Sequence, residues 1–204
     1  MSAPGDVVET VDLVFGLAGE SLPRDYRAAL WDALARAAPW LRAEPAAGLH
    51  PVRASEGGER WLLSRRSRLV LRVPLARADE AAALAGSELS AGGHPIRLGS
   101  ARRRPIEPSP TVGAAFVVSG EAGELEHQQR LTAALRELGL PERVIFGRMT
   151  QLRAGTGMLT GSSVVVHQLG AAASLRLLHG GLGPHRGIGC GLFVPYKEIA
   201  GLTD

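Results

Sequence analysis

Two successive halves of the chain carry the same order of strand-like and helix-like patterns, and this repeat most limits the possible folds. Near the start, Val11, Leu13 and Phe15 alternate with Asp12 and Val14, as in a strand with one buried face. Each half then continues with a helical pattern, two extended segments, a second helix and a last extended segment. This order, βαββαβ, is the split ferredoxin-like arrangement, in which both helices cover one face of a four-stranded antiparallel sheet.

Within the first half, helix signals and alternation set the expected boundaries. A helix is predicted to start at Ser21 or Pro23 and to end or kink at Pro39. A strand follows over residues 68–74, with Leu69, Leu71 and Val73 on one face and Arg68, Val70 and Arg72 on the other. A second helix is expected over residues 77–85 and a hairpin around Gly92 and Gly93, whose freedom at positive φ suits a turn.

The second half repeats this order. Strands are predicted over residues 112–118, 144–152, 158–167 and 188–194, with a turn at residues 155–157. Helices are predicted from Leu125 to Gly139 and over residues 171–178. We therefore expect an α+β protein with tandem ferredoxin-like units, similar to RNA-recognition modules, and a cleft between the two sheets.

A basic, proline-spaced stretch separates the halves. Arg102, Arg103 and Arg104 are followed closely by Pro105, Pro108 and Pro110, and proline disfavours regular pairing. The predicted organisation is an N-terminal unit over residues 1–103, a linker over 104–110 and a C-terminal unit over 111–204.

Composition narrows the function classes. The net charge is only +3, but 22 of the 23 basic residues are arginine, which suits bidentate contacts with phosphate. A GC-rich genome would produce the same bias, so both explanations stay open. The one cysteine, Cys190, excludes an internal disulfide. We expect a cytoplasmic protein with no membrane segment and no cofactor, because neither a signal peptide nor a long apolar run is visible.

A glycine-rich run spans residues 180–191 and contains Gly180, Gly181, Gly183, Gly187, Gly189 and Gly191. Such a run lets backbones approach closely, and its amides can form a concave nest for phosphate. It has no Gly-Lys-Ser/Thr ending and leads into a predicted strand, so it is neither a Walker loop nor a dinucleotide-binding loop.

This run, the repeated element order and three further segments resemble the CRISPR-associated repeat-RNA endoribonuclease family. The segments are GLHPVR (48–53), SRRSRLVLRVP (64–74) and GGHPIRLG (92–99), which look like the short subtype called type I-MYXAN. The resemblance implies a metal-independent cut of precursor guide RNA, in which a ribose 2′-hydroxyl attacks the adjacent phosphorus. The products would carry 2′,3′-cyclic phosphate and 5′-hydroxyl ends.

The family usually places its catalytic histidine between the first helix and the second strand of the first unit, and His50 occupies that position. Imidazole suits proton transfer because its ordinary pKa is near neutral pH. Arg53, three residues after His50, is the candidate cation for the phosphorane, because a cation stabilises the negative charge that develops there. The family often uses a lysine or tyrosine beside its histidine, and this chain has no lysine nearby. No spacing of ligand residues favours a metal site.

The other histidines have weaker assignments. His94, in Gly-Gly-His-Pro, is the second candidate, although a turn or packing role fits it better. His127 is expected to be solvated, and His167 to be structural. His179 and His185 flank the glycine-rich run and could contact RNA backbone.

RNA binding is assigned to arginines, the partner being CRISPR repeat RNA as precursor or mature guide, with other Cas subunits of a type I effector complex as further expected partners. The predicted contacts are Arg68, Arg72, Arg102, Arg103, Arg104, Arg148, Arg153 and Arg186. The family also implies that the hairpin with its tip at residues 155–157 contacts the base of a repeat stem-loop. Two alternatives remain open: a non-catalytic RNA-binding subunit of a CRISPR complex, and a two-module scaffold that binds no RNA.

Overall fold

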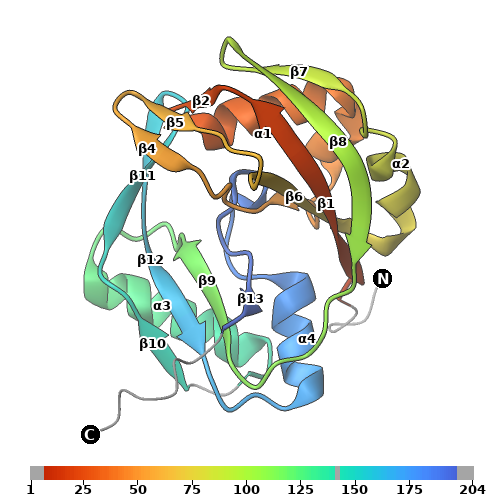
Figure 1. Cartoon of the computed structure of the whole chain (residues 1–204). Coiled ribbons are helices and arrows are strands. Elements are labelled where there is room, and N and C mark those ends of the chain that lie inside the picture. The colour runs from red at the N-terminus through yellow and green to blue at the C-terminus, as the bar shows by residue number, and fades with distance from the viewer. Residues whose placement is uncertain (1–6, 141–142, 197–204) are drawn as a thin grey trace, which may run out of the picture.

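A computed structural model describes residues 7–140 and 143–196, which form two mixed units that follow one another along the chain (Figure 1). The expected unit ends at residues 1 and 204 lie outside these residues. The strands of the first unit are β1 (Thr10–Gly19), β2 (Ser21–Pro23), β3 (Gly48–Leu49), β4 (Ser55–Gly57), β5 (Arg60–Leu62), β6 (Arg68–Pro74), β7 (Glu88–Ala91) and β8 (His94–Arg104). Its helices are α1 (Tyr26–Ala37) and α2 (Ala78–Ala82), with 3-10 turns η1 (Pro39–Ala43) and η2 (Leu75–Arg77).

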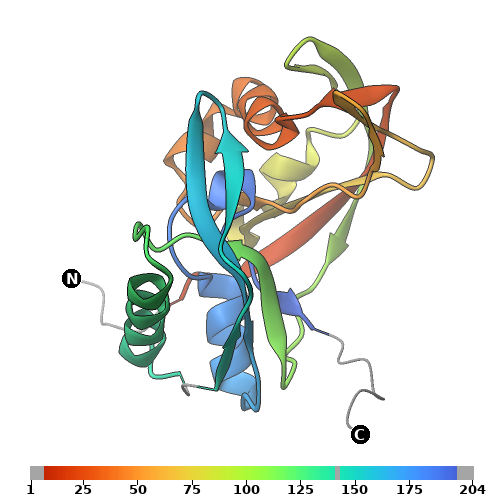
Figure 2. The same cartoon turned by 90° about the vertical axis from the view of Figure 1, so that its left-hand side faces the viewer.

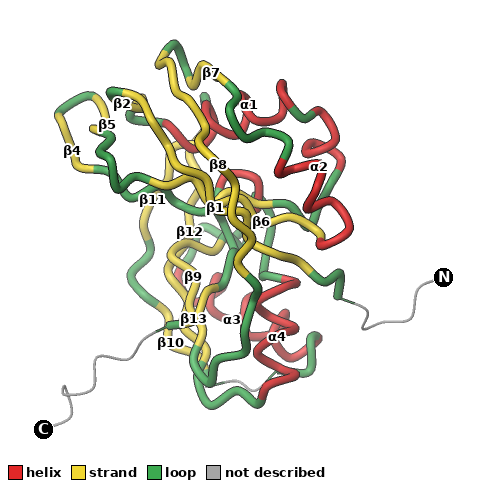
Figure 3. The backbone as a smooth tube through the Cα atoms, turned by 45° about the vertical axis from the view of Figure 1, so that its right-hand side comes forward, coloured by secondary structure: helices red, strands yellow, loops and turns green. Residues whose placement is uncertain are grey.

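Strand β1 lies at the centre of a five-stranded sheet of order β3-β6-β1-β8-β7, in which all neighbours are antiparallel. Alternation along β1 places the fully buried Leu13 and Phe15 toward the helices and Asp12 toward the opposite face. Helices α1 and α2 both lie on one side of this sheet, as Figure 3 shows. A small separate sheet of order β2-β5-β4 extends from the unit.

The second unit contains β9 (Val112–Val117), α3 (Glu124–Glu137), β10 (Val144–Phe146), β11 (Thr150–Ala154), β12 (Gly157–Val166), α4 (Ala171–Gly180), η3 (Arg186–Ile188) and β13 (Val194–Pro195). Its main sheet has the order β10-β12-β9-β13, and β11 pairs with β12 as a hairpin. Without the extra short strands, both units share the βαββαβ order and the same strand arrangement. The predicted fold class, tandem ferredoxin-like units, is confirmed.

Three local predictions are wrong. Ser21 and Pro23 do not start a helix but form β2, which pairs with β5, and α1 starts at Tyr26. Of the strand predicted over residues 188–194 only Val194 is in a strand, because most of the glycine-rich run adopts turns and positive φ. The linker predicted over residues 104–110 starts one residue too early, because Arg104 is the last residue of β8.

The two units touch at several places. The β11–β12 hairpin rises from the second unit beside the first (Figure 2). Burial raises the pKa of the Asp25 carboxyl in the first unit, and the backbone of Gly155 at the hairpin tip opposes that shift. Turn η3 packs against β3 and α1. No helix among the described residues is both long and apolar enough to cross a membrane.

Candidate active site at the contact between the two units

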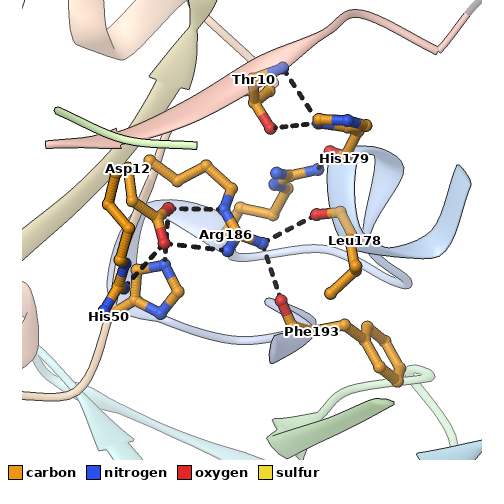
Figure 4. A network of polar contacts seen from close by, with 9 residues as sticks. Thr10, Asp12, His50, Leu178, His179, Arg186 and Phe193 are labelled. Atoms are coloured by element: carbon orange, nitrogen blue, oxygen red, sulfur yellow. Dashed lines mark hydrogen bonds and ion pairs between the residues drawn. The ribbon is translucent and has the colours of Figure 1, made fainter. Parts of the chain in front are cut away.

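A buried carboxylate, Asp12, organises a polar network between the units (Figure 4). Its Oδ1 accepts hydrogen bonds from Arg72 Nε at 2.8 Å and from His50 Nε2 at 3.2 Å. Its Oδ2 accepts from Arg104 Nη2 at 2.8 Å and from Arg72 Nη2 at 3.2 Å. Two guanidinium groups and one imidazole therefore surround a single carboxylate.

Sheet register brings these residues together. Asp12 pairs with Arg72 on β6 and with Arg104 on β8, so all three side chains lie on the face opposite the helices. His50 follows β3 directly, and its amide donates to the carbonyl of Val70 at 2.9 Å, which continues the sheet ladder. The expected position of His50 ahead of the second strand is therefore wrong by a few residues.

The charges around Asp12 fix its ionisation. Burial raises the pKa of the carboxyl, but the hydrogen bonds from His50 and Arg72 and their charges outweigh burial, and the net pKa lies well below its ordinary value. Asp12 is thus an anion that only accepts hydrogen bonds. The His50 Nε2 atom must carry the proton that it shares with Asp12, so in the neutral ring Nδ1 is the free base.

The His50 ring is poised as a neutral base. Burial lowers the pKa of His50, and Asp12 opposes that shift only in part. The residue is 8% exposed. Its Nδ1 forms no hydrogen bond with a described residue, and it is not one of the fully buried polar atoms that lack a partner. Nδ1 therefore remains open to solvent and can accept a proton at neutral pH.

Arg72 is not the surface RNA contact that the sequence predicts. It is 1% exposed, and its Nη1 donates to the carbonyls of Leu178 and Phe193 in the second unit at 2.7 and 2.8 Å. Strand alternation correctly places it away from Leu69 and Leu71, but the second unit covers that part of the sheet face. Arg72 joins the two units, so any cleft between them does not extend to this position.

The three consecutive arginines diverge, because successive residues of a strand face opposite sides. Arg104 is half exposed and bonds Asp12, whereas Arg103 pairs with Asp79 on α2. Arg102 is exposed and forms no ion pair within the described residues. Arg53 is also exposed, and it forms no ion pair with Asp12. Arg104 is the half-exposed cation that shares the Asp12 carboxylate with His50.

The glycine-rich run packs between the units. A Cβ at Gly187 would meet the Trp31 ring, one at Gly189 would meet the Leu49 carbonyl beside His50, and one at Gly191 would meet the Leu182 carbonyl. Small residues are thus needed for close approach. Six amides of the run donate within the protein, so the predicted phosphate nest is wrong for these groups, which are those of Gly181, Leu182, Ile188, Gly189, Cys190 and Gly191.

Arg186 is half-buried and folds back over the run. Its Nη1 donates to the carbonyls of His179 and Gly180, while Nε and Nη2 are buried without a partner. Burial, followed by the nearby charge of Arg72, lowers the pKa of Arg186 to about 10. The Arg186 guanidinium is therefore not exposed for RNA binding, contrary to the prediction from the sequence.

His127 and His94 both contact serine side chains. His127, expected to be solvated, is fully buried, and its ring nitrogens bond Ser119 at 2.7 Å and Ser162 at 3.0 Å. That prediction is wrong because the ring faces β12 and not the acidic side of α3. His94 bonds Ser21 at 3.0 Å, in agreement with a packing role.

Among the other predicted contacts, Arg68, Arg148 and Arg153 are exposed. Asp12 was not among the predicted site residues. Its position between Val11 and Leu13 in an apolar strand could have indicated a buried charge with a specific role. Nowhere in residues 7–140 and 143–196 do three or more histidine, cysteine, aspartate or glutamate side chains gather as a metal site would require.

Comparison with known proteins of similar sequence and fold indicates one family. The family model described as Cas6 Crispr matches residues 11–198. The CRISPR-associated endonuclease Cas6 of Myxococcus xanthus is 29% identical over 197 residues, which cover 96% of this chain and 86% of that protein.

Solved structures share the fold at low sequence identity. A CRISPR associated protein Cas6 superposes with a TM-score of 0.67 at 10% identity, covering 93% of this chain and 100% of the other. A protein described as a RAMP protein binding different RNA substrates gives 0.60 at 13% identity, covering 92% and 100%. The product of a Cas6-related gene from Pyrococcus furiosus gives 0.59 at 11% identity, covering 93% and 99%. With its family match extending over both units, this chain belongs to the Cas6 family.

Proposed function

We propose that this protein is a metal-independent endoribonuclease that binds CRISPR repeat RNA and cuts precursor guide RNA. The observation that carries the proposal is His50, whose Nε2 is held by Asp12 and whose Nδ1 has no hydrogen-bond partner among residues 7–140 and 143–196. Family membership supports the substrate class, since the Myxococcus xanthus relative is named as a Cas6 endonuclease.

In the proposed reaction, His50 Nδ1 removes the proton of a ribose 2′-hydroxyl. The 2′-oxygen attacks the neighbouring phosphorus, and the bond to the 5′-oxygen breaks. The leaving 5′-oxygen takes a proton from water, and the His50 imidazolium releases its proton to the solvent, which restores the base. The products carry a 2′,3′-cyclic phosphate and a 5′-hydroxyl, and no metal ion is needed to activate the nucleophile. Ionised Asp12 keeps the ring in the tautomer that presents Nδ1 and stabilises the imidazolium that forms.

Arg104 is the proposed cation for the phosphorane, in place of Arg53. Its Nη2 is bound to Asp12 at 2.8 Å, and the side chain is 47% exposed, so other donors of the guanidinium can face a phosphate. A fixed cation beside a developing negative charge lowers the barrier without reorganisation at the moment of reaction. The exposed Arg68, Arg102, Arg148 and Arg153 are the proposed phosphate contacts for binding.

A second candidate function is a non-catalytic RNA-binding subunit of a CRISPR complex. The observation that favours it is the low exposure of His50, 8%, which leaves only Nδ1 to meet RNA. In either case, association with other Cas subunits of a type I effector complex is part of the proposal.

One experiment separates the two functions. A synthetic repeat RNA, labelled at its 5′ end, is incubated with the protein in EDTA, and the products are resolved before and after phosphatase treatment. Cleavage with a cyclic phosphate end supports the endoribonuclease. Tight binding without a cut in EDTA, or a cut that requires added metal ion, contradicts it.

A further inference from the structure

A second feature of the first unit is a hollow of about 580 Å³ on the sheet face away from α1 and α2. The ends of β1, β6 and β8 and the chain after β5 border it (Figure 1). Its size lies within the range of pockets that take small organic ligands. None of the residues that line it belongs to the network around His50.

The floor of the hollow is bare backbone. Gly16 on β1 and Gly99 on β8 face one another, and a Cβ on Gly99 would lie 3.3 Å from the Gly16 Cα. Neither glycine has positive φ, so backbone conformation does not demand glycine at these positions. What the two glycines provide is a strip of sheet surface without side chains, over which a flat ring can lie.

The rim is basic. Arg65, Arg68 and Arg97 line the hollow, all three are exposed, and no acidic residue lines it. Within the described residues none of them forms an ion pair, although Glu88 lies opposite Arg97 in the β7–β8 register. Arg68 is held in place because its Nη1 donates to the carbonyls of Arg65 and Ser67 at 2.9 and 2.8 Å.

Exposed arginines around a flat floor are suited to bind an anionic ligand that also carries a planar ring. Guanidinium planes can stack on an unpaired base while neighbouring arginines bind the phosphates. A paired base is not available for such a pocket, because both of its faces are stacked within the helix. The chemistry therefore favours a nucleotide from a single-stranded segment.

The hollow and the His50 network lie on the same sheet face. Gly16 and Asp12 lie four residues apart on β1, which corresponds to about 13 Å. Exposed Arg102 pairs with Val14 between them. A short stretch of RNA can thus lie along β1 and β8 with one end in the hollow and the scissile phosphate at His50.

We propose that this hollow binds an unpaired nucleotide of the RNA substrate, outside the stem of the repeat. The inference rests on the proposed RNA-binding function, and it adds a specific subsite for single-stranded RNA. Arg65, Arg68 and Arg97 bind its phosphates, and the glycine floor takes its base.

The test compares the binding of two RNAs, a repeat hairpin with its unpaired flanks and the same hairpin trimmed to stem and loop. Gly16→Val places a side chain in the hollow, and its Cβ would lie 3.7 Å from the Gly99 Cα, which is ordinary van der Waals contact. Arg97→Ala removes an exposed charge without touching the floor. Arg130→Ala on α3 in the second unit is the control for loss of one exposed arginine.

Each pocket variant is expected to weaken binding of the flanked hairpin about tenfold, the order of one lost base contact, and to leave the trimmed hairpin unchanged. Arg130→Ala should not discriminate between the RNAs. Equal losses on both RNAs, or no loss on either, would overturn the subsite. If the wild type binds both RNAs but cuts neither, the catalytic proposal fails. The difference in binding between the flanked and the trimmed hairpin still tests the subsite in that case. A wild type that binds neither RNA contradicts both.

Discussion

His50 Nε2 lies 3.2 Å from Oδ1 of Asp12, so a ring that follows a two-residue strand is oriented by a carboxylate on the central strand of the sheet. The hydrogen bond to Asp12 occupies Nε2 and orients the ring, so Nδ1 is the nitrogen that can take part in proton transfer. The first three predictions follow from this division.

Replacing His50 with alanine should lower the single-turnover cleavage rate by roughly 10²–10⁴-fold, the usual contribution of a general base. Repeat binding should change little, because one imidazole contributes little to a contact with many phosphates. His167→Ala, at a half-buried position just after β12, is the matched control. An unaltered rate in the His50 variant would remove this residue from the mechanism.

Asp12→Asn should slow cleavage and also shift its pH profile. Because the charge of Asp12 raises the pKa of His50, its removal should move the acid limb of the rate profile to lower pH. The change also leaves Arg72 without its counter-charge, and breaking such a buried pair costs about 3–5 kcal/mol. Rates and chemical unfolding are measured together, with Asp79→Asn, whose side chain is 97% exposed, as the control.

Stability should fall as the solution becomes acidic. The pKa of His50 and that of Asp12 both lie below their ordinary values, so the unfolded chain binds more protons at low pH. The contribution of His50 is complete above about pH 6.5 and is lost below it, and that of Asp12 is lost below about pH 4. Unfolding free energies of the wild type and His50→Gln across this range check the assignment: equal slopes below pH 6.5 would refute the role of His50.

The glycine-rich run should tolerate substitution unevenly. Gly191 has φ of +65° and no room for a Cβ, so Gly191→Ala should destabilise the protein by at least about 2 kcal/mol. Gly180, at the end of α4, has only the side chain of Val7 nearby, and Gly180→Ala should leave the melting temperature unchanged or slightly higher. Similar losses in both variants would contradict a packing role for specific glycines.

The neighbouring arginines at the end of β8 should differ in RNA binding. Arg102→Ala removes an exposed charge on the open sheet face and should lower the salt dependence of binding by about one phosphate contact. Arg103→Ala, on the other face beside Asp79, should not alter that slope. Titrations at several salt concentrations measure both, and equal effects would contradict the assignment of RNA binding to the face that carries Arg102.

Much of the fold could be predicted because it depends on local periodicity. Alternation along residues 10–15 and 68–74 and the leucine spacing of α3 correspond to observed elements. The errors arose where tertiary contacts decide. Ser21 forms β2 because β5 pairs with it, and the end of the glycine-rich run is irregular because Trp31 and Leu49 require its glycines.

The candidate site was predicted less completely, because its partners come from distant parts of the chain. His50 could be selected from the sequence, but its link to Asp12 depends on sheet register. Arg72 illustrates the limit. Strand alternation places its side chain on the correct face, yet only the packing of the second unit shows that this face is covered there.

The contact between Arg72 and the second unit limits how far the two halves can vary independently. Arg72 belongs to one half but depends on carbonyls of Leu178 and Phe193 in the other, and a separated N-terminal half would lose both acceptors for Nη1. Although the architecture is a duplication, its halves are therefore not interchangeable modules. A graft that replaces one half with its counterpart from a distant relative must bring a matching pair of acceptors, or the chimera will not assemble around Asp12.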